Sequence, residues 1–356
     1  MPSTAHQTAE HAASDGSAGS GVSAAGVQPG AASAGVAPAA AAPSHASVWS
    51  ALVKARLSAL VLLTAAVGFA VAPEAQGPEG FLWARMGWMC LGTGLAAASA
   101  AMLNQVWERH RDARMHRTAQ RPLPAGHARP LTVLLVGIAT GYAGCAVLGI
   151  MVNLLSAWLA LANILIYVLL YTPLKPRTTF NTLVGAVTGA LPPMIGWVGA
   201  TNHIDPGAWA LFGLLFVWQI PHFLALAWMY RTDYARGGFA MLPSLDTQGH
   251  ATAQACLLTS LLLVPTGLLV TITGVSGVAY AVVAALLGLG MTYFAARFAM
   301  QRTDRAARSL FLASLAYLPL LMAAMVLDRG NPFGPPPLAP GQHEIVIEVP
   351  AHAASN

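Results

Sequence analysis

The chain has 356 residues, of which 56% are hydrophobic and only 9% are charged. A soluble globular domain contains about 25% charged residues, so this composition excludes that class and predicts an integral membrane protein. The net charge of +5 does not indicate a nucleic-acid partner, because the basic residues lie in loops between apolar runs and form no basic domain. The three cysteines all lie within apolar runs, and their spacing forms no metal-binding motif.

The two ends of the chain differ from the apolar part in composition. Residues 1–47 are rich in Ala, Gly, Ser and Pro without hydrophobic periodicity, which predicts a disordered extension. The first basic residue is Lys54, whereas a signal peptide begins with basic residues and a mitochondrial presequence is rich in Arg. We therefore expect an uncleaved cytoplasmic extension. Residues 329–356 are Pro-rich and then polar, which predicts a loose tail after a membrane domain of residues 48–328.

Nine apolar runs follow the extension, each near the ~20 residues that cross a bilayer as a helix. They cover residues 57–72, 86–103, 131–152, 154–172, 183–200, 208–230, 255–273, 276–298 and 309–327. The runs predict an all-α polytopic membrane protein. We expect nine transmembrane helices in the lipid bilayer, around a central cavity that opens to the cytoplasmic face.

The basic residues predict the orientation of these helices. Of the 18 Lys and Arg residues, all but Arg85 and Arg329 fall on one side when loops are assigned alternately to the two faces. The positive-inside rule then places the N-terminus in the cytoplasm and the C-terminus outside. We expect the protein in the inner (cytoplasmic) membrane of a bacterial cell.

Three polar residues mark the end of the second apolar run. Asn104, Glu108 and Asp112 are spaced i, i+4, i+8, and each step of four residues turns an α-helix only ~40° beyond a full circle. The three side chains therefore share one helix face. Two carboxylates and an amide are oxygen ligands suited to Mg²⁺, which completes its shell with water and substrate phosphate.

Four arginines surround this acidic face. They are Arg109, Arg114, Arg117 and Arg121. Because Arg pairs bidentately with phosphate oxygens, acidic and basic residues together suit a complex of Mg²⁺ with a diphosphate. The alternative is a cytoplasmic loop with ordinary topology charges and i,i+4 ion pairs. The acidic face favours a functional site, because few acidic residues lie near the apolar runs.

A second cluster lies between the fourth and fifth runs, on the same predicted side of the membrane. Lys175 and Arg177 are candidates to hold a diphosphate, and Asn181 is a candidate polar contact. The alternative for the two cations is again a topology signal.

The sixth run and the loop after it carry further polar residues. Gln219 and His222 lie at membrane depth and, at i and i+3, share a helix face. His222 is a candidate axial ligand of a porphyrin iron or a general base, and the alternative is a helix-packing contact. Asp233 either completes a second metal site or pairs with Arg236.

Seven stretches together resemble the intramembrane prenyltransferase superfamily over about residues 48–328. They are N-Q-x-x-E-x-x-x-D-A-x-M-x-R-T-x-x-R-P-L from Asn104, Y-T-x-L-K-x-x-T-x-x-N from Tyr171, G-A-x-P-P-x-x-G-W from Gly189, W-Q-x-P-H-F-x-A-L-A from Trp218, D-Y-x-R-G-G from Asp233, M-L-P from Met241 and S-L-x-Y-L-P-L-L from Ser314. The first motif is typical of the superfamily. The motifs from Trp218 and Ser314 resemble its protohaem IX farnesyltransferase (haem O synthase) branch.

The resemblance implies a reaction and a set of site residues. The farnesyl group of farnesyl diphosphate would move to a vinyl group of haem b, a substrate, with addition of water, giving haem o and diphosphate. Asn104, Glu108, Asp112 and Asp233 would hold the cofactor Mg²⁺, and Lys175 would share in catalysis. Substrate contacts would come from Arg117, Arg121, Arg177, Asn181, Gln219, His222, Tyr234 and Arg236. Contact with a haem A synthase is a further expectation.

Two positions depart from the superfamily pattern, and three other functions are alternatives. Glu108 stands where Asp is usual, and Thr232 precedes Asp233 where an acid is common. A sibling prenyltransferase for an aromatic acid, a quinone precursor or a chlorophyllide would share the metal–diphosphate site and differ in its acceptor. A transporter or channel would need polar residues across the membrane, and a non-enzymatic assembly protein would not need the acidic face.

Overall fold

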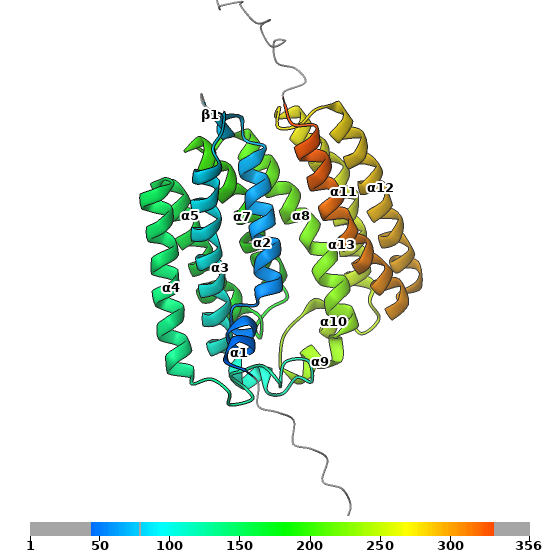
Figure 1. Ribbon diagram of the computed structural model, residues 1–356. Coiled ribbons are helices and arrows are strands. Elements are labelled where there is room, and N and C mark those ends of the chain that lie inside the picture. The colour runs from blue at the N-terminus through cyan, green and yellow to red at the C-terminus, as the bar shows by residue number, and fades with distance from the viewer. Residues whose placement is uncertain (1–43, 78–79, 331–356) are drawn as a thin grey trace, which may run out of the picture. The chain divides into compact units, whose positions relative to one another are not determined.

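The computed structural model describes residues 44–77 and 80–330, whose regular structure is almost entirely helical (Figure 1). The elements in chain order are α1 (His45–Leu52), α2 (Ala55–Ala70), η1 (Pro73–Ala75), β1 (Gln76–Gly77), β2 (Gly80–Phe81), α3 (Trp83–Asp112), α4 (Pro130–Met151), α5 (Leu154–Leu165), η2 (Ile166–Tyr171), α6 (Thr172–Leu174), α7 (Asn181–Thr201), α8 (Pro206–Met229), α9 (Arg231–Arg236), α10 (Leu242–Leu245), α11 (His250–Ile272), α12 (Val278–Gln301) and α13 (Asp304–Leu327). β1 and β2 form a short antiparallel hairpin that the sequence did not predict. Most of the two expected tails, residues 1–43 and 331–356, lies outside the described residues.

The helices confirm the predicted all-α membrane fold. Within the described residues, eight helical segments are long and apolar enough to span a bilayer, with α5, η2 and α6 forming one of them. Helices α1 and α2 are bent by 52° at a short break and count as a ninth span if taken together. The count of nine therefore stays a prediction. Residues 45–47, expected in the extension, form the first turn of α1.

Several helices begin at residues that cap the unpaired backbone N–H groups of the first turn. Asn153 accepts from the backbone N–H of Ser156 at 2.8 Å at the start of α5, and Asp205 accepts from Ala208 at 3.0 Å before α8. Pro206 occupies the first position of α8, where its missing N–H costs no hydrogen bond. These residues explain why helices begin after very short connections.

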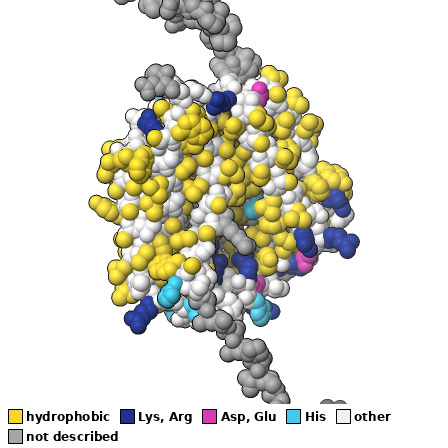
Figure 2. Space-filling model, viewed as in Figure 1, with side chains coloured by type: hydrophobic (Ala, Val, Ile, Leu, Met, Phe, Trp, Pro, Cys, Tyr) yellow, Lys and Arg dark blue, Asp and Glu magenta, His cyan; other side chains and the backbone are white. Residues whose placement is uncertain are grey.

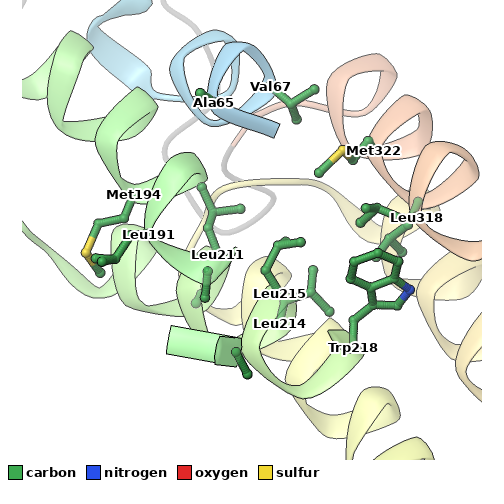
Figure 3. Packing of buried hydrophobic residues seen from close by; sticks show 14 of the residues in the cluster. Ala65, Val67, Leu191, Met194, Leu211, Leu214, Leu215, Trp218, Leu318 and Met322 are labelled. Atoms are coloured by element: carbon green, nitrogen blue, oxygen red, sulfur yellow. The ribbon is translucent and has the colours of Figure 1, made fainter. Parts of the chain in front are cut away.

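Helices α7 and α8 form the centre of the membrane domain. Among the most apolar 18 residues of each helix, 78% are buried in α7 and 67% in α8, against 28% in α4 and in α12. Figure 3 shows Trp218 of α8 beside Leu318 of α13, with Met322 nearby. The outer helices instead expose apolar side chains, and Figure 2 shows hydrophobic residues covering the middle of the visible face. This pattern suits a protein surrounded by lipid.

Two glycines let α2 and α7 cross closely. A Cβ atom added at Gly196 would overlap the carbonyl oxygen of Ala65, and one added at Gly68 would overlap that of Pro193. Small residues at helix crossings allow backbones in membranes to approach and to gain van der Waals contacts. The crossing therefore depends on the absence of side chains at both positions.

Replacing Gly196 by Ala is expected to lower the free energy of unfolding by about 1–3 kcal/mol, because the backbone of α2 must move away. Thermal unfolding of the detergent-solubilised protein measures the change. Gly213→Ala in α8 is the matched control, since an added Cβ meets no atom within 4 Å there. Equal losses in the two variants would contradict the close crossing.

Candidate active site

The three polar residues at the end of α3 are buried together, on the face that the sequence predicts. Asn104, Glu108 and Asp112 are 0%, 3% and 1% exposed, and Asp112 is the last residue of the helix. A buried carboxylate is costly unless it is paired and hydrogen-bonded. The neighbouring elements must therefore supply partners to this face.

Each of the three side chains is contacted by a different cation. Lys54 Nζ donates to Asn104 Oδ1 at 3.2 Å, and Arg121 Nη1 donates to Asp112 Oδ2 at 2.7 Å. Lys175 Nζ donates to Glu108 Oε2 at 3.2 Å and lies 2.9 Å from Oε1. The cations come from three places: the break between α1 and α2, the loop after α3, and the end of α6.

These groups line a small cavity of about 60 Å³. Its charged and amide-bearing lining residues are Lys54, Asn104, Glu108, Asp112, Arg117, Arg121 and Lys175. Tyr171, Tyr234 and Phe239 add aromatic walls. Four cations and two carboxylates give the lining a net charge of +2, which favours an anionic ligand.

Lys175 stays protonated in this site. Burial lowers its pKa, but the Glu108 carboxylate, with the hydroxyls of Tyr171 and Tyr167 nearby, outweighs burial and raises the pKa above its ordinary value. The ammonium also lies 4.6 Å from the ring centre of Tyr171 and 5.7 Å from that of Phe239. Lys175 is thus a fixed positive charge at the wall of the cavity.

Arg117 also reaches the cavity from the loop after α3. Its Nη2 atom donates to the Tyr234 hydroxyl at 3.0 Å, and its guanidinium lies 4.9 Å from the ring centre of Tyr230. The structure therefore brings Tyr234 and Arg117 together, two residues that are distant in sequence.

Asp233 holds the backbone of the loop after α3. Its carboxylate accepts from the N–H groups of His116 at 3.0 Å and Arg117 at 3.2 Å, and Arg236 lies 3.7 Å away. Burial raises the pKa of Asp233, but the two N–H groups outweigh it and bring the pKa below its ordinary value. Asp233 does not contribute to the described lining of the cavity, so its metal-ligand role stays a prediction.

Three further predicted residues, Arg177, Asn181 and Arg236, are not part of the described lining of the cavity. Asn181 Nδ2 donates to the carbonyls of Thr178 at 2.6 Å and Ala240 at 3.0 Å, which ties the start of α7 to the loop before α10. Arg177 is exposed on the adjacent loop. Their substrate contacts, like that of Arg236, stay predictions.

Gln219 and His222 lie on α8, outside the described lining of the cavity. Gln219 Nε2 donates to the carbonyls of Leu215 at 2.9 Å and Ala186 at 3.3 Å, so its amide group joins α8 to α7. His222 Nδ1 lies 2.8 Å from Ser314 Oγ of α13. Gln219 thus contributes to packing, and its predicted substrate contact stays a prediction.

The oxygen atoms of the α3 face fit a hard divalent cation. Glu108 Oε1 is buried without a hydrogen bond among the described side chains, and Arg121 contacts Asp112 through the Oδ2 atom. Within those residues no three His, Cys, Asp or Glu side chains are placed to hold a metal. Mg²⁺ bound here would combine Asn104 and the two carboxylates with water and phosphate oxygens, as is usual for this ion.

The sequence patterns missed two polar residues of this site. From the sequence, Lys54 is interpreted only as one of the basic residues that set the orientation in the membrane, although its side chain reaches Asn104. Thr172 accepts from Asn104 Nδ2 at 3.0 Å through its hydroxyl, and it follows the π-helical segment η2. No periodic pattern predicts either contact, because both depend on tertiary packing.

The fold is that of intramembrane prenyltransferases. The structure of a digeranylgeranylglyceryl phosphate synthase in membranes matches with a TM-score of 0.67 at 13% identity, covering 80% of this chain and 98% of that chain. A UbiA homologue from Archaeoglobus fulgidus, bound to DMAPP and Mg²⁺, matches with a TM-score of 0.56 at 15% identity over 78% of this chain and 98% of that one. At these identities the likeness concerns the fold alone.

The family follows from the sequence. A profile of the UbiA prenyltransferase family matches residues 61–315, and the chain belongs to this family. It is 42% identical over 283 residues to the protohaem IX farnesyltransferase of Solibacter usitatus, covering 78% of this chain and 97% of the relative. The farnesyltransferase of Salinibacter ruber is 43% identical over 78% of this chain and 96% of its own. The mitochondrial enzyme of Arabidopsis thaliana is 37% identical over 78% of this chain and 64% of its own.

Replacing Lys175 by Gln is expected to lower the free energy of unfolding by about 3–5 kcal/mol, because the buried Glu108 carboxylate loses its counter-ion. Thermal unfolding without substrates measures the loss, and adding Glu108→Gln to the same chain should recover part of it. Asp304→Asn removes the more exposed partner of the pair with Arg231 and should cost less than about 1 kcal/mol. Equal costs for the two single variants would contradict the importance of the buried pair.

Proposed function

We propose that the chain transfers the farnesyl group of farnesyl diphosphate to a vinyl group of haem b, with addition of water, to give haem o and diphosphate. Binding of the diphosphate is supported by the acidic face of α3, which is enclosed by Lys54, Arg121 and Lys175. The names of the curated relatives support haem b as the acceptor. A step in the synthesis of haem o, and from it haem a, for terminal oxidases follows from this activity.

Farnesyl diphosphate, haem b and water account for every bond that breaks or forms in this reaction. The bond between the farnesyl C1 atom and the diphosphate oxygen breaks, and the electron pair leaves with the diphosphate. The vinyl group of haem b forms a new carbon–carbon bond to C1, which leaves a cation on the haem side chain. Water adds to that cation and loses a proton, which gives the hydroxyl group of haem o.

The residues of the chain act mainly on the leaving diphosphate. Mg²⁺, when bound by Asn104, Glu108 and Asp112, with Asp233 as the predicted fourth ligand, supplies positive charge against it. Lys54, Lys175, Arg117 and Arg121 line the cavity and stabilise the charge that grows on the diphosphate oxygens. Arg177, Asn181 and Arg236 remain candidate contacts on its rim.

The surroundings of the cavity suit a carbocation. The ring centre of Tyr171 lies 4.6 Å from the Lys175 ammonium, and the electron-rich face of an aromatic ring attracts a positive charge. Apolar helices above the cavity would hold the farnesyl tail and keep water from the first cation.

We also infer that the cavity faces the cytoplasm, with the N-terminus inside and the C-terminus outside. The support is the distribution of Lys and Arg residues among the loops. The expected membrane is the inner membrane of a bacterial cell, and a haem A synthase is the expected consumer of haem o. A phosphatase that is active only outside the cytoplasm, fused after Gly330, should be active, and an inactive, expressed fusion would contradict the orientation.

The activity is tested by incubating membranes with haem b, farnesyl diphosphate and Mg²⁺ and detecting haem o by mass. Asp112→Asn keeps the shape of the side chain but removes its charge, so we expect turnover to fall about 10²–10³-fold while haem b binding is retained. Chelation of the metal should abolish turnover, and added Mg²⁺ should restore it.

Asp304→Asn is the control for Asp112→Asn, because Asp304 is 63% exposed in its side chain and pairs with Arg231 outside the cavity lining. It should leave turnover unchanged. Failure of active, folded wild-type membranes to make haem o would sink the proposed reaction. A different prenylated acceptor in the same assay would instead favour a sibling prenyltransferase.

A further inference from the structure

A histidine at membrane depth is held on three sides by residues of α8 and α13. The His222 ring stacks on Trp218 with ring centres 5.1 Å apart, and the tilted ring of Phe311 lies 4.8 Å away. Its Nδ1 atom lies 2.8 Å from Ser314 Oγ. Trp218 Nε1 donates to the Ser314 carbonyl at 3.0 Å, so the two helices are also joined beside the ring. The orientation of the imidazole is therefore fixed before any ligand arrives.

The hydrogen bonds of Ser314 determine which ring nitrogen carries the proton. A serine hydroxyl has one proton to donate, and Ser314 Oγ lies 2.6 Å from the carbonyl oxygen of Phe311. With that proton committed, Oγ accepts a hydrogen bond from His222 Nδ1–H. A neutral imidazole protonated at Nδ1 has its lone pair at Nε2.

The second nitrogen of His222 is open. Among the side chains that the structure describes, none forms a hydrogen bond with Nε2, and Nε2 is not one of the fully enclosed polar atoms that lack a partner. Buried polar atoms in proteins are normally paired, so a histidine that only joined two helices would not need a free, accessible nitrogen. Gln219, three residues earlier on the same face, has that packing role, because its amide group donates to two backbone carbonyls.

We propose that His222 binds the iron of haem b through Nε2 and that Ser314 is the positioning residue that fixes the ring and its tautomer. A histidine that binds a metal almost always donates its other N–H to a neighbouring acceptor, which orients the ring and makes it a better ligand. The Ser314 hydroxyl is that acceptor. The inference rests on the proposed function and deepens it, since it states how the acceptor is held.

The test is haem b binding by the purified protein in detergent without farnesyl diphosphate, followed by absorption and resonance Raman spectra. The wild type should give the spectrum of histidine-ligated haem. His222→Ala should lose it, and added imidazole should restore it. His203→Ala, in an exposed turn, is the matched control and should keep the wild-type spectrum.

Ser314 is tested by the same spectra and by the haem affinity. Ser314→Ala should shift the iron–histidine stretching band and weaken haem binding about 10–100-fold. Ser314→Thr keeps the hydroxyl and should restore the band. Ser309 also lies on α13, and its exposed hydroxyl donates a hydrogen bond to the Arg305 carbonyl. Ser309→Ala should change neither the iron–histidine band nor the haem affinity. Thermal unfolding establishes that each variant is folded before haem is added.

The outcomes separate this inference from the proposed function. If the wild type makes haem o but folded His222→Ala binds haem with an unchanged spectrum, the iron contact is wrong and the reaction stands. An unchanged band and affinity in folded Ser314→Ala would remove the positioning role. If Ser314→Ala does not fold, loss of the wild-type band in folded Ser314→Thr would contradict that role. Absence of both haem binding and haem o would overturn the proposed function itself.

Discussion

The burial of two carboxylates at the end of α3 is the constraint on which the site depends. Glu108 and Asp112 are almost without contact with solvent, and a charge in such a place needs an opposite charge and hydrogen bonds. Arg121 and Lys175 supply them from two different loops. The ends of distant segments therefore converge on one helix face, and the cavity is a consequence of that convergence.

The same pairing prepares the site for a diphosphate. Lys54, Arg121 and Lys175 are already held in place by the groups that would bind the metal, and Arg117 is held by Tyr234, so little reorganisation is needed when an anionic substrate enters. Asp233 extends the arrangement by fixing the backbone of residues 116 and 117, next to the Arg117 side chain. The histidine proposed to hold the acceptor lies elsewhere, on α8, where its Nδ1 atom contacts Ser314 of α13. In this proposal, diphosphate chemistry and haem binding depend on different helices.

The local part of this architecture could be predicted from the sequence. Helix periodicity placed Asn104, Glu108 and Asp112 on one face, and hydropathy located the apolar part of each long helix. The polar ends were missed, because α3 continues nine residues beyond the apolar run that ends at residue 103, and α11 and α13 begin five residues before theirs. The role of Lys54 could not be predicted, because its backbone is left-handed, with φ of 49°, at the break between α1 and α2. The pairing of Asp233 with Arg236 was one of the two predicted alternatives. Its contacts with the N–H groups of His116 and Arg117, and that of Gln219 with the Ala186 carbonyl, could not be predicted, because tertiary packing brings these backbone groups near. The identity of the acceptor, haem b, is inferred from the family resemblance and from the relatives, because no spacing of residues indicates a porphyrin substrate.

The central claim is that the α3 face and its cations bind a metal–diphosphate complex. Calorimetric titration of the purified protein with an unreactive farnesyl thiodiphosphate, with and without Mg²⁺ and in the absence of haem, tests it most directly. The account predicts tight binding only with Mg²⁺, and loss of that Mg²⁺ dependence when Glu108 and Asp112 are both changed to their amides. Equal affinity with and without Mg²⁺, or unchanged Mg²⁺-dependent binding in the folded double variant, would contradict it.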